Sequence, residues 1–207
     1  MDEVKTVPCR ARGLVTAQDG TRIAYERYGF GEGPPLILVG GAGGAGGNDS
    51  VLAGLLAQRF PVVAYERRTG PGAGRVEREI ADLAALVDAV GAAGPAGPAA
   101  VHGTASGGAL ALAAAAAGVP VGPVSVYEPT YPVGGEGAAV RLGRVPARVL
   151  VVDGGASPSS TRRAARTVAA AVPRGRHRTL TGQTHEVSPH VLAPVLADFY
   201  AEEQAGG

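Results

Sequence analysis

The 207-residue sequence predicts an α/β fold, in which helices cover both faces of a mostly parallel central sheet. Three observations carry this prediction. Short, continuous apolar runs alternate with amphipathic segments, which is the pattern of buried parallel strands joined by helical crossovers. Two strand-like segments at the start, separated by a turn signal, indicate an antiparallel hairpin and therefore a mixed sheet. No linker or internal repeat interrupts the pattern, so we expect one domain over 1–207, with a core from about 13 to 203.

The first elements are a hairpin and a buried strand that ends in glycines. The hairpin is expected over residues 13–28, with Asp19-Gly20 as the turn between its two strands. The continuous apolar run 36–39 predicts the buried strand, and it leads directly into the glycine-rich stretch 40–47. Clustered glycines at a strand end favour tight turns around a site over a flexible low-complexity chain.

The rest of the chain alternates between helices and strands. Asn48, Asp49 and Ser50 can each act as an N-cap, which predicts a helix over about 51–59. In the segment 77–90, apolar residues recur on one face at helical spacing. The expected order after the first helix is a strand at 61–65, a helix at 77–90, a strand over 98–101, an alanine-rich helix, strands at 121–127 and 147–152, a helix at 159–172, a strand at 177–180 and a last helix at 189–203.

Composition narrows the classes of function. The net charge is +1 and no basic stripe interleaves with aromatic residues, so we expect no nucleic-acid partner. The single cysteine, Cys9, forbids an internal disulfide and fits a reducing compartment. The first residues lack the plan of a signal peptide, and the apolar run Ala111–Ala117 is too short to span a bilayer. We therefore expect a cytoplasmic protein without a membrane anchor, metal or cofactor, and the sequence leaves its oligomeric state open.

The most informative stretch is Gly103-Thr104-Ala105-Ser106-Gly107, which follows an apolar run and precedes an alanine-rich segment. Strand, sharp turn and helix form the context of the G-x-S-x-G nucleophile elbow. The middle residue of that motif is the attacking serine, and here it is Ala105, whose methyl group cannot be a nucleophile. A register shifted by one residue would make Ser106 the nucleophile. That register places Thr104 at a tight position that glycine fits better.

The order of hairpin, glycine-rich strand end, elbow and C-terminal histidine resembles the α/β-hydrolase superfamily over about residues 13–203. The stretches TRIAY, YERR and GQTH, at 21–25, 65–68 and 182–185, resemble it as well. The resemblance implies that His185 is the general base. It also implies an oxyanion hole made by the backbone N–H of Ser106 and that of Gly41 or Ala42.

The acid that would orient His185 is left open between two residues. Many family members place an aspartate in a stretch resembling 154–158, but here that slot holds Ser157. Asp153 lies earlier, inside the strand end, where its side chain is poorly placed to reach the site. Glu128 ends the sixth strand, the other position at which the fold can supply an acid. We favour Glu128, with Asp153 as the second choice.

Family members often insert a helical lid after the sixth strand. Here only 16 residues separate Pro129 from Pro146, and they are rich in glycine. We therefore expect no substantial cap domain. The resulting open site would suit a small-molecule substrate that is bulky or carrier-bound, or it would be completed by a partner chain.

A dinucleotide site is a competing interpretation of the glycine-rich stretch. Residues 41–46 match G-x-G-x-x-G, and Glu66 lies 20 residues beyond Gly46. The fingerprint needs its helix to open within the glycines, whereas the predicted N-cap follows them. The preceding hairpin also argues against this interpretation.

Three functions remain open for a site with alanine at the nucleophile position. In the first, which we favour, Ala105 is an engineered replacement in a serine hydrolase or acyl-transfer enzyme acting on esters or thioesters. In the second, the chain naturally lacks a nucleophile, and His185 with Glu128 transfers protons in a cyclisation, isomerisation or elimination of a biosynthetic pathway. In the third, the pocket binds a ligand without catalysis.

Overall fold

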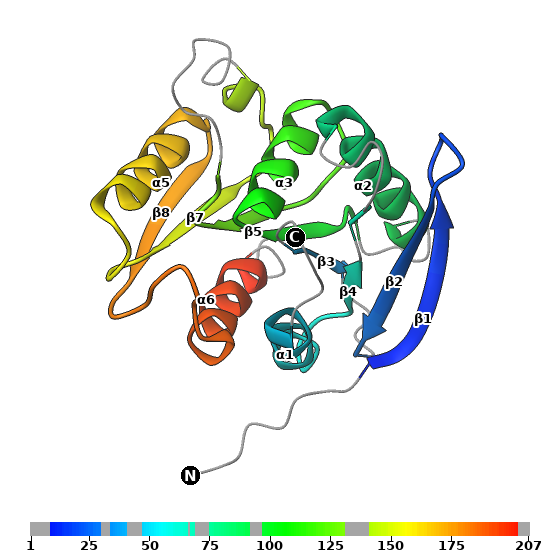
Figure 1. Cartoon of the computed structure of the whole chain (residues 1–207), viewed down its shortest axis with the longest axis horizontal. Helices are drawn as coiled ribbons and strands as arrows, with labels where there is room; N and C mark the ends of the chain where they lie inside the picture. Colours follow the sequence, from blue (N-terminus) through cyan, green and yellow to red (C-terminus); the bar gives the residue numbers. More distant parts are fainter. Residues whose placement is uncertain are drawn as a thin grey trace.

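The computed structural model describes residues 9–29, 34–40, 47–65, 67–68, 75–91, 97–130 and 141–202. Its centre is an eight-stranded sheet with the strand order β1-β2-β4-β3-β5-β6-β7-β8 (Figure 1). The strands are β1 (Cys9–Thr16), β2 (Arg22–Tyr28), β3 (Leu36–Val39), β4 (Val62–Tyr65), β5 (Ala100–Thr104), β6 (Val124–Tyr127), β7 (Val149–Gly154) and β8 (Gly175–Leu180).

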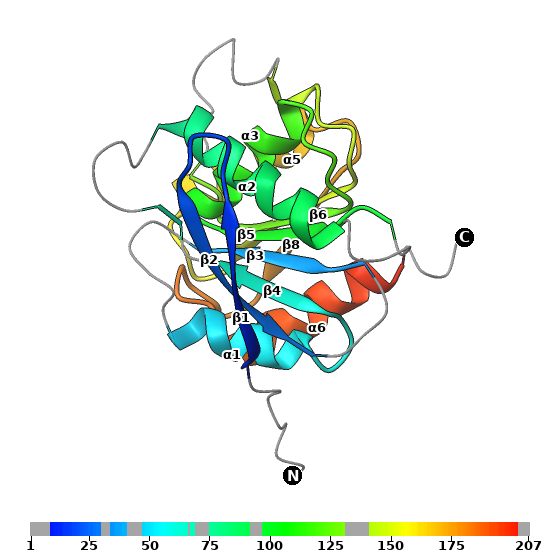
Figure 2. The same ribbon diagram turned by 90° about the vertical axis from the view of Figure 1, so that its right-hand side faces the viewer.

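Most neighbouring strands of this sheet run in the same direction. The pairs formed by β3, β4, β5, β6, β7 and β8 are all parallel, whereas β2 is antiparallel to both β1 and β4. The hairpin of β1 and β2 forms one edge of the sheet and faces the viewer in Figure 2. The predicted fold class, a mostly parallel sheet that begins with an antiparallel hairpin, is confirmed.

Helices lie on both faces of the sheet, as predicted. They are α1 (Gly47–Leu56), α2 (Val76–Gly91), α3 (Ser106–Ala116), α5 (Ser159–Ala171) and α6 (Pro189–Ala201). Figure 1 shows α2, α3 and α5 on one face and α1 with α6 on the other. Each face has its own buried cluster, represented by Leu83 and Leu112 on the first and by Leu56 and Leu196 on the second. The two apolar layers explain why the inner parallel strands β3, β4, β6 and β7 are largely apolar, whereas the edge strand β8 is partly exposed and carries Arg176, His177 and Arg178.

The register of the parallel strands brings several strand ends to one edge of the sheet. Val39 at the end of β3 pairs with Gly103 near the end of β5. Thr104, the last residue of β5, pairs with Tyr127, which in turn pairs with Val152 on β7. The segments that follow these strands therefore start side by side, which is where open α/β sheets bind their ligands.

Several element boundaries differ from the expectation by a few residues, for example β5, which spans 100–104 where 98–101 was predicted, and two of the differences have a clear physical reason. The strand β1 begins at Cys9, before residue 13, because β2 offers it a partner as far as Tyr28. The helix α1 begins at Gly47, so the residues expected to cap it lie in its first turn. Asparagine, aspartate and serine are typical of the cap itself, but an acidic residue is also favoured in the first turn by the helix dipole, so this signal cannot fix the start.

The connection between β6 and β7 spans residues 128–148, which is too short for a cap domain. This agrees with the expectation of no substantial cap. The sheet order also differs from the 3-2-1-4-5-6 order of dinucleotide-binding sheets. Residues 41–46 and Glu66, on which that interpretation depended, lie outside the described residues.

Candidate active site

Ala105 lies at the junction of β5 and α3, and its backbone is strained. Its φ is 50° and its ψ is −116°, a region that residues other than glycine rarely occupy. The Ala105 N–H donates to the carbonyl of Tyr127 at 2.9 Å, and its own carbonyl accepts from Ala109 in the first turn of α3. The strand therefore turns sharply into the helix at this residue, which is the geometry of a nucleophile elbow.

The glycines on either side of Ala105 allow three backbone segments to approach closely. A Cβ added to Gly103 would lie 2.5 Å from the backbone of Gly107. A Cβ on Gly107 would lie 2.1 Å from the carbonyl oxygen of Val39. These are the two tight positions of the G-x-S-x-G motif, and they flank Ala105. Thr104, the tight position of the shifted register, is the last residue of β5.

Ser106 is the first residue of α3, and its hydroxyl is engaged by an arginine. The Nη1 group of Arg67 donates to the Ser106 Oγ at 2.9 Å and to the carbonyl of Gly40 at 3.3 Å. Ser106 is in the first turn of α3, so its backbone N–H lies at the N-terminal end of the helix, the end that favours a negative charge. The two other predicted oxyanion donors, Gly41 and Ala42, lie outside the described residues.

His185 and Glu128 form a hydrogen-bonded pair. The distance from His185 Nδ1 to Glu128 Oε2 is 2.9 Å, and the other carboxylate oxygen accepts from the Gly154 N–H at 2.9 Å. The Glu128 side chain is fully buried, whereas 58% of the His185 side chain is exposed. With its proton on Nδ1 facing the carboxylate, the imidazole presents Nε2 as a proton acceptor. A histidine held in this way by a carboxylate can act as a general base.

A second contact joins the same two segments. Tyr127, which precedes Glu128, donates its hydroxyl to the carbonyl of Thr184, which precedes His185, at 2.5 Å. Burial, with the nearby charges of Glu128 and Asp153, raises the pKa of Tyr127 well above its ordinary value. The hydroxyl therefore stays protonated and remains a donor. It fixes the loop that carries the histidine.

The remaining acid and histidines have other partners. The buried Asp153 binds His177 Nε2 through Oδ2 at 2.7 Å, so the structure pairs Asp153 with His177 and Glu128 with His185. His102 is buried on β5 with its Nδ1 2.8 Å from Ser125 Oγ, and burial lowers its pKa to about 4. His190 lies in the first turn of α6.

Sequence reasoning did not identify Tyr127 or Arg67 as residues of the site. Tyr127 could have been noticed only as the neighbour of Glu128, because an aromatic residue in a buried strand is common and does not by itself indicate a functional site. Arg67 had a further signal. Glu79 lies four residues before Leu83 and Asp82 four residues before Leu86, so helical spacing places both acids near the apolar face of the 77–90 segment, where they need cationic partners.

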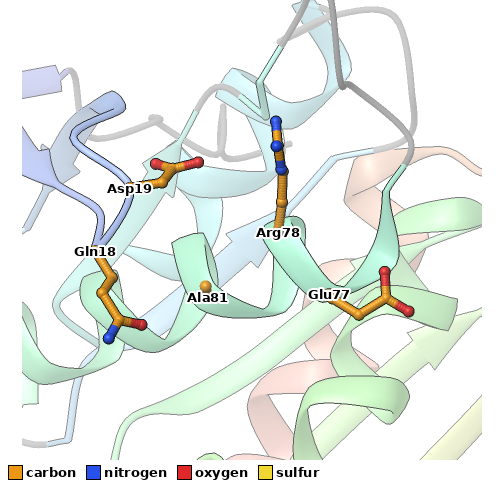
Figure 3. A pocket seen from close by; sticks show the side chains of 5 residues that line it. All are labelled: Gln18, Asp19, Glu77, Arg78 and Ala81. Carbon is orange, nitrogen blue, oxygen red and sulfur yellow. The ribbon is translucent and has the colours of Figure 1, made fainter.

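The described residues show no further site of comparable definition. In this part of the chain no group of three or more His, Cys, Asp or Glu is placed to hold a metal ion. No described helix has the length and apolarity to cross a membrane. A shallow hollow lies between the hairpin turn and α2 (Figure 3), and it is lined by Gln18, Asp19, Glu77, Arg78 and Ala81, none of which is a predicted site residue.

Comparison with solved structures identifies close matches over nearly the whole chain. An α/β hydrolase from Sphaerobacter thermophilus is 33% identical, with a TM-score of 0.78, and the match covers 91% of this chain and 100% of that one. A dienelactone hydrolase from Anabaena variabilis is 14% identical, with a TM-score of 0.80 and coverages of 97% and 99%. A thermophilic esterase from Thermogutta terrifontis is also 14% identical, with a TM-score of 0.74 and coverages of 93% and 99%.

At 14% identity the last two matches show a shared fold alone. No protein-family model matches the chain, and no curated protein matches its sequence.

Proposed function

The chain belongs to the α/β-hydrolase superfamily, and from this premise we propose that its site is that of a serine hydrolase or acyl-transfer enzyme acting on esters or thioesters, with alanine at the nucleophile position. One observation carries the proposal. Ala105 has the strained φ of 50° that an elbow needs, and the close approaches of Gly103 and Gly107 maintain it. A strained backbone costs free energy, is held in place by the surrounding structure and is typical of active sites. The methyl group of alanine has no chemistry that this conformation would serve, whereas a serine hydroxyl has.

The role of each group follows from its position relative to residue 105. A serine hydroxyl there would lose its proton to His185 Nε2 as it attacks the acyl carbon. The Glu128 carboxylate, 2.9 Å from Nδ1, would stabilise the imidazolium that forms. The N–H of Ser106, with that of Gly41 or Ala42, would bind the oxyanion of the tetrahedral intermediate. Alanine removes the first step and leaves the other parts unused.

Restoring the hydroxyl tests this proposal. Loss of a serine nucleophile lowers turnover on the order of 10⁶-fold, so the chain with Ala105 should not measurably hydrolyse simple esters or thioesters. We expect Ala105→Ser to turn them over, and Ala105→Ser combined with His185→Ala to lose that activity. A serine form that stays inactive while its fold is unchanged would contradict the proposal.

Proton transfer without a covalent intermediate is the second candidate. It is favoured by the complete Glu128–His185 pair, whose half-exposed imidazole can act on a substrate without any nucleophile. The reaction would be a cyclisation, isomerisation or elimination, with the same backbone donors stabilising an enolate or alkoxide. In that case His185→Ala would abolish the activity, and Ala105→Ser would bring no gain. Ligand binding without turnover in any variant would instead indicate a non-catalytic binding protein.

The substrate class is proposed from the short connection after β6. Residues 128–148 cannot form a cap domain, so a small substrate would be poorly shielded from water. We therefore propose a bulky or carrier-bound acyl substrate. Comparing free thioesters with the same acyl group on a carrier protein tests this, and equal kcat/KM values would contradict it.

A further inference from the structure

We propose that Arg67 is a positioning residue that holds the two backbone segments of the oxyanion hole in fixed relation. This inference rests on the proposed function of the site. The hydrogen bonds of Arg67 in the described part of the chain go to Gly40, Ser106 and Glu79, so Arg67 would act on the site through the end of β3 and the start of α3. The strand and helix it joins are the ones from which both oxyanion donors are expected.

The Arg67 guanidinium contacts three elements at once. The two hydrogens of Nη1 point to the carbonyl of Gly40, at 3.3 Å, and to the hydroxyl of Ser106, at 2.9 Å. The Nη2 group forms an ion pair with Glu79 on α2. The planar fork of an arginine suits such an arrangement, because its donors leave in fixed directions. Arg67 therefore connects the end of β3 and the start of α3 to the helix α2.

Both contacts on Nη1 restrain a segment from which an oxyanion donor is expected. The Ser106 side chain belongs to the residue whose backbone N–H is the first predicted donor, at the start of α3. The Gly40 carbonyl lies directly after β3, at the strand end that leads into the segment expected to supply the second donor. Arg67 therefore restrains the backbone at the two ends between which the oxyanion would be bound.

Stability alone is a weak reason for this ion pair. The side chains of Arg67 and Glu79 are only 14% and 8% exposed. Removing two charges from water is costly, and apolar residues of similar size often stabilise a fold as well as a buried ion pair does. What apolar residues cannot supply is a set of directed hydrogen bonds to Gly40 and Ser106. The geometry of the contacts is therefore the better explanation of the buried pair.

The next residue provides a matched control. Arg68 is 8% exposed and binds Asp82 on the same helix α2 through both Nε and Nη2. Its Nη1 group binds Asp19 in the hairpin turn, at 3.0 Å. Arg67 and Arg68 thus share burial, charge and an acidic partner on α2. They differ in that Arg67 reaches the elbow and the end of β3.

Kinetics in the Ala105→Ser form test the effect on catalysis. We expect Arg67→Met to lower kcat and the rate of fluorophosphonate labelling about 10- to 100-fold with little change in KM, as a displaced oxyanion donor does. Arg67→Lys keeps the charge without the fork and should recover only a small part of the rate. Arg68→Met should change kcat less than about 3-fold. Because Arg67 acts partly through the Ser106 hydroxyl, Arg67→Met should cost less in a Ser106→Ala background.

A structural measurement on the chain with Ala105 separates failure of this inference from failure of the proposed function. We expect Arg67→Met to shift the backbone amide resonances of Gly40 and Ser106, and Arg68→Met to leave them in place. Unchanged resonances in folded Arg67→Met and Arg67→Lys proteins would overturn the inference, as would an equal loss of kcat in the two methionine variants. An Ala105→Ser form that never reacts would overturn the proposed function, and the resonances would still decide whether Arg67 holds the two segments.

Discussion

Gly107→Ala should destabilise the protein, because the elbow leaves no room for a methyl group there. The new Cβ would lie 2.1 Å from the Val39 carbonyl oxygen and 2.5 Å from that of Gly40. Ordinary van der Waals contact begins at 3.4 Å, so the α3 backbone and β3 would have to separate. The strand cannot retreat easily, because β3 is paired on both sides, with β4 and β5.

The expected magnitude is a balance of two effects. Alanine gains about 1 kcal/mol over glycine from helix propensity, and overpacking a close contact costs about 1–3 kcal/mol or more. The two atoms that the new Cβ would meet are backbone carbonyl oxygens, which cannot move aside as a side chain can. We therefore expect an overpacking cost of about 3 kcal/mol and a net loss of about 2 kcal/mol. For a chain of this size that corresponds to a decrease in Tm of roughly 4–8 °C.

Urea unfolding followed by circular dichroism measures this loss, and Gly91→Ala is the matched control. Gly91 is the last residue of α2, and a Cβ there would meet no described atom within 4 Å. That variant should be as stable as the parent, or more stable by up to about 1 kcal/mol. If Gly107→Ala were as stable as Gly91→Ala, the close approach of α3 to β3 would be wrong.

Three further predictions concern the acid, the buried histidine and a buried hydroxyl. In the Ala105→Ser form, Glu128→Gln should lower kcat about 10³- to 10⁴-fold, because an amide N–H facing the imidazole favours the wrong tautomer; Asp153→Asn, measured on the same ester, should stay within a few-fold of the parent. Burial lowers the pKa of His102 from 6.5 to about 4, so between these two pH values the unfolded chain binds more protons than the folded protein. The free energy of unfolding should therefore decrease by about 3 kcal/mol as the pH falls from 6.5 to about 4. His102→Asn should lack this contribution, and parallel curves of unfolding free energy against pH for the two proteins would refute it. Tyr200→Phe removes a hydroxyl that bridges β5 and β6 and should cost about 1–3 kcal/mol in urea unfolding, whereas no loss would show that this bridge is unimportant.

The fold could be predicted because its signals are local and repeated. Most of the parallel strands, such as β3 and β4, are short apolar runs that become buried between two layers of helices, and the exception is the edge strand β8. The sequence predicts less precisely where each element begins and ends. Where a strand begins depends on the length of its partner, and the position of Tyr28 opposite Cys9 is a property of the assembled sheet.

Members of the candidate site could be predicted only where a residue type and its place in a motif coincide. His185 and the favoured acid, Glu128, stand within hydrogen-bonding distance in the structure, and the second choice, Asp153, faces His177. Which of two acids faces a histidine depends on side-chain direction at a strand end, which the sequence does not specify. Arg67 was harder still, because its partners lie on three different elements.

The central claim is that residue 105 occupies the nucleophile position of an acyl-transfer site that lacks only the serine hydroxyl. Its most direct test is mass spectrometry of the parent and the Ala105→Ser form after exposure to a fluorophosphonate, with the adduct located by peptide mapping. The account predicts a single adduct at position 105 in the Ala105→Ser form, its loss when His185→Ala is added, and no adduct in the parent. An adduct at Ser106 in the parent, or none in a folded Ala105→Ser protein, would contradict it.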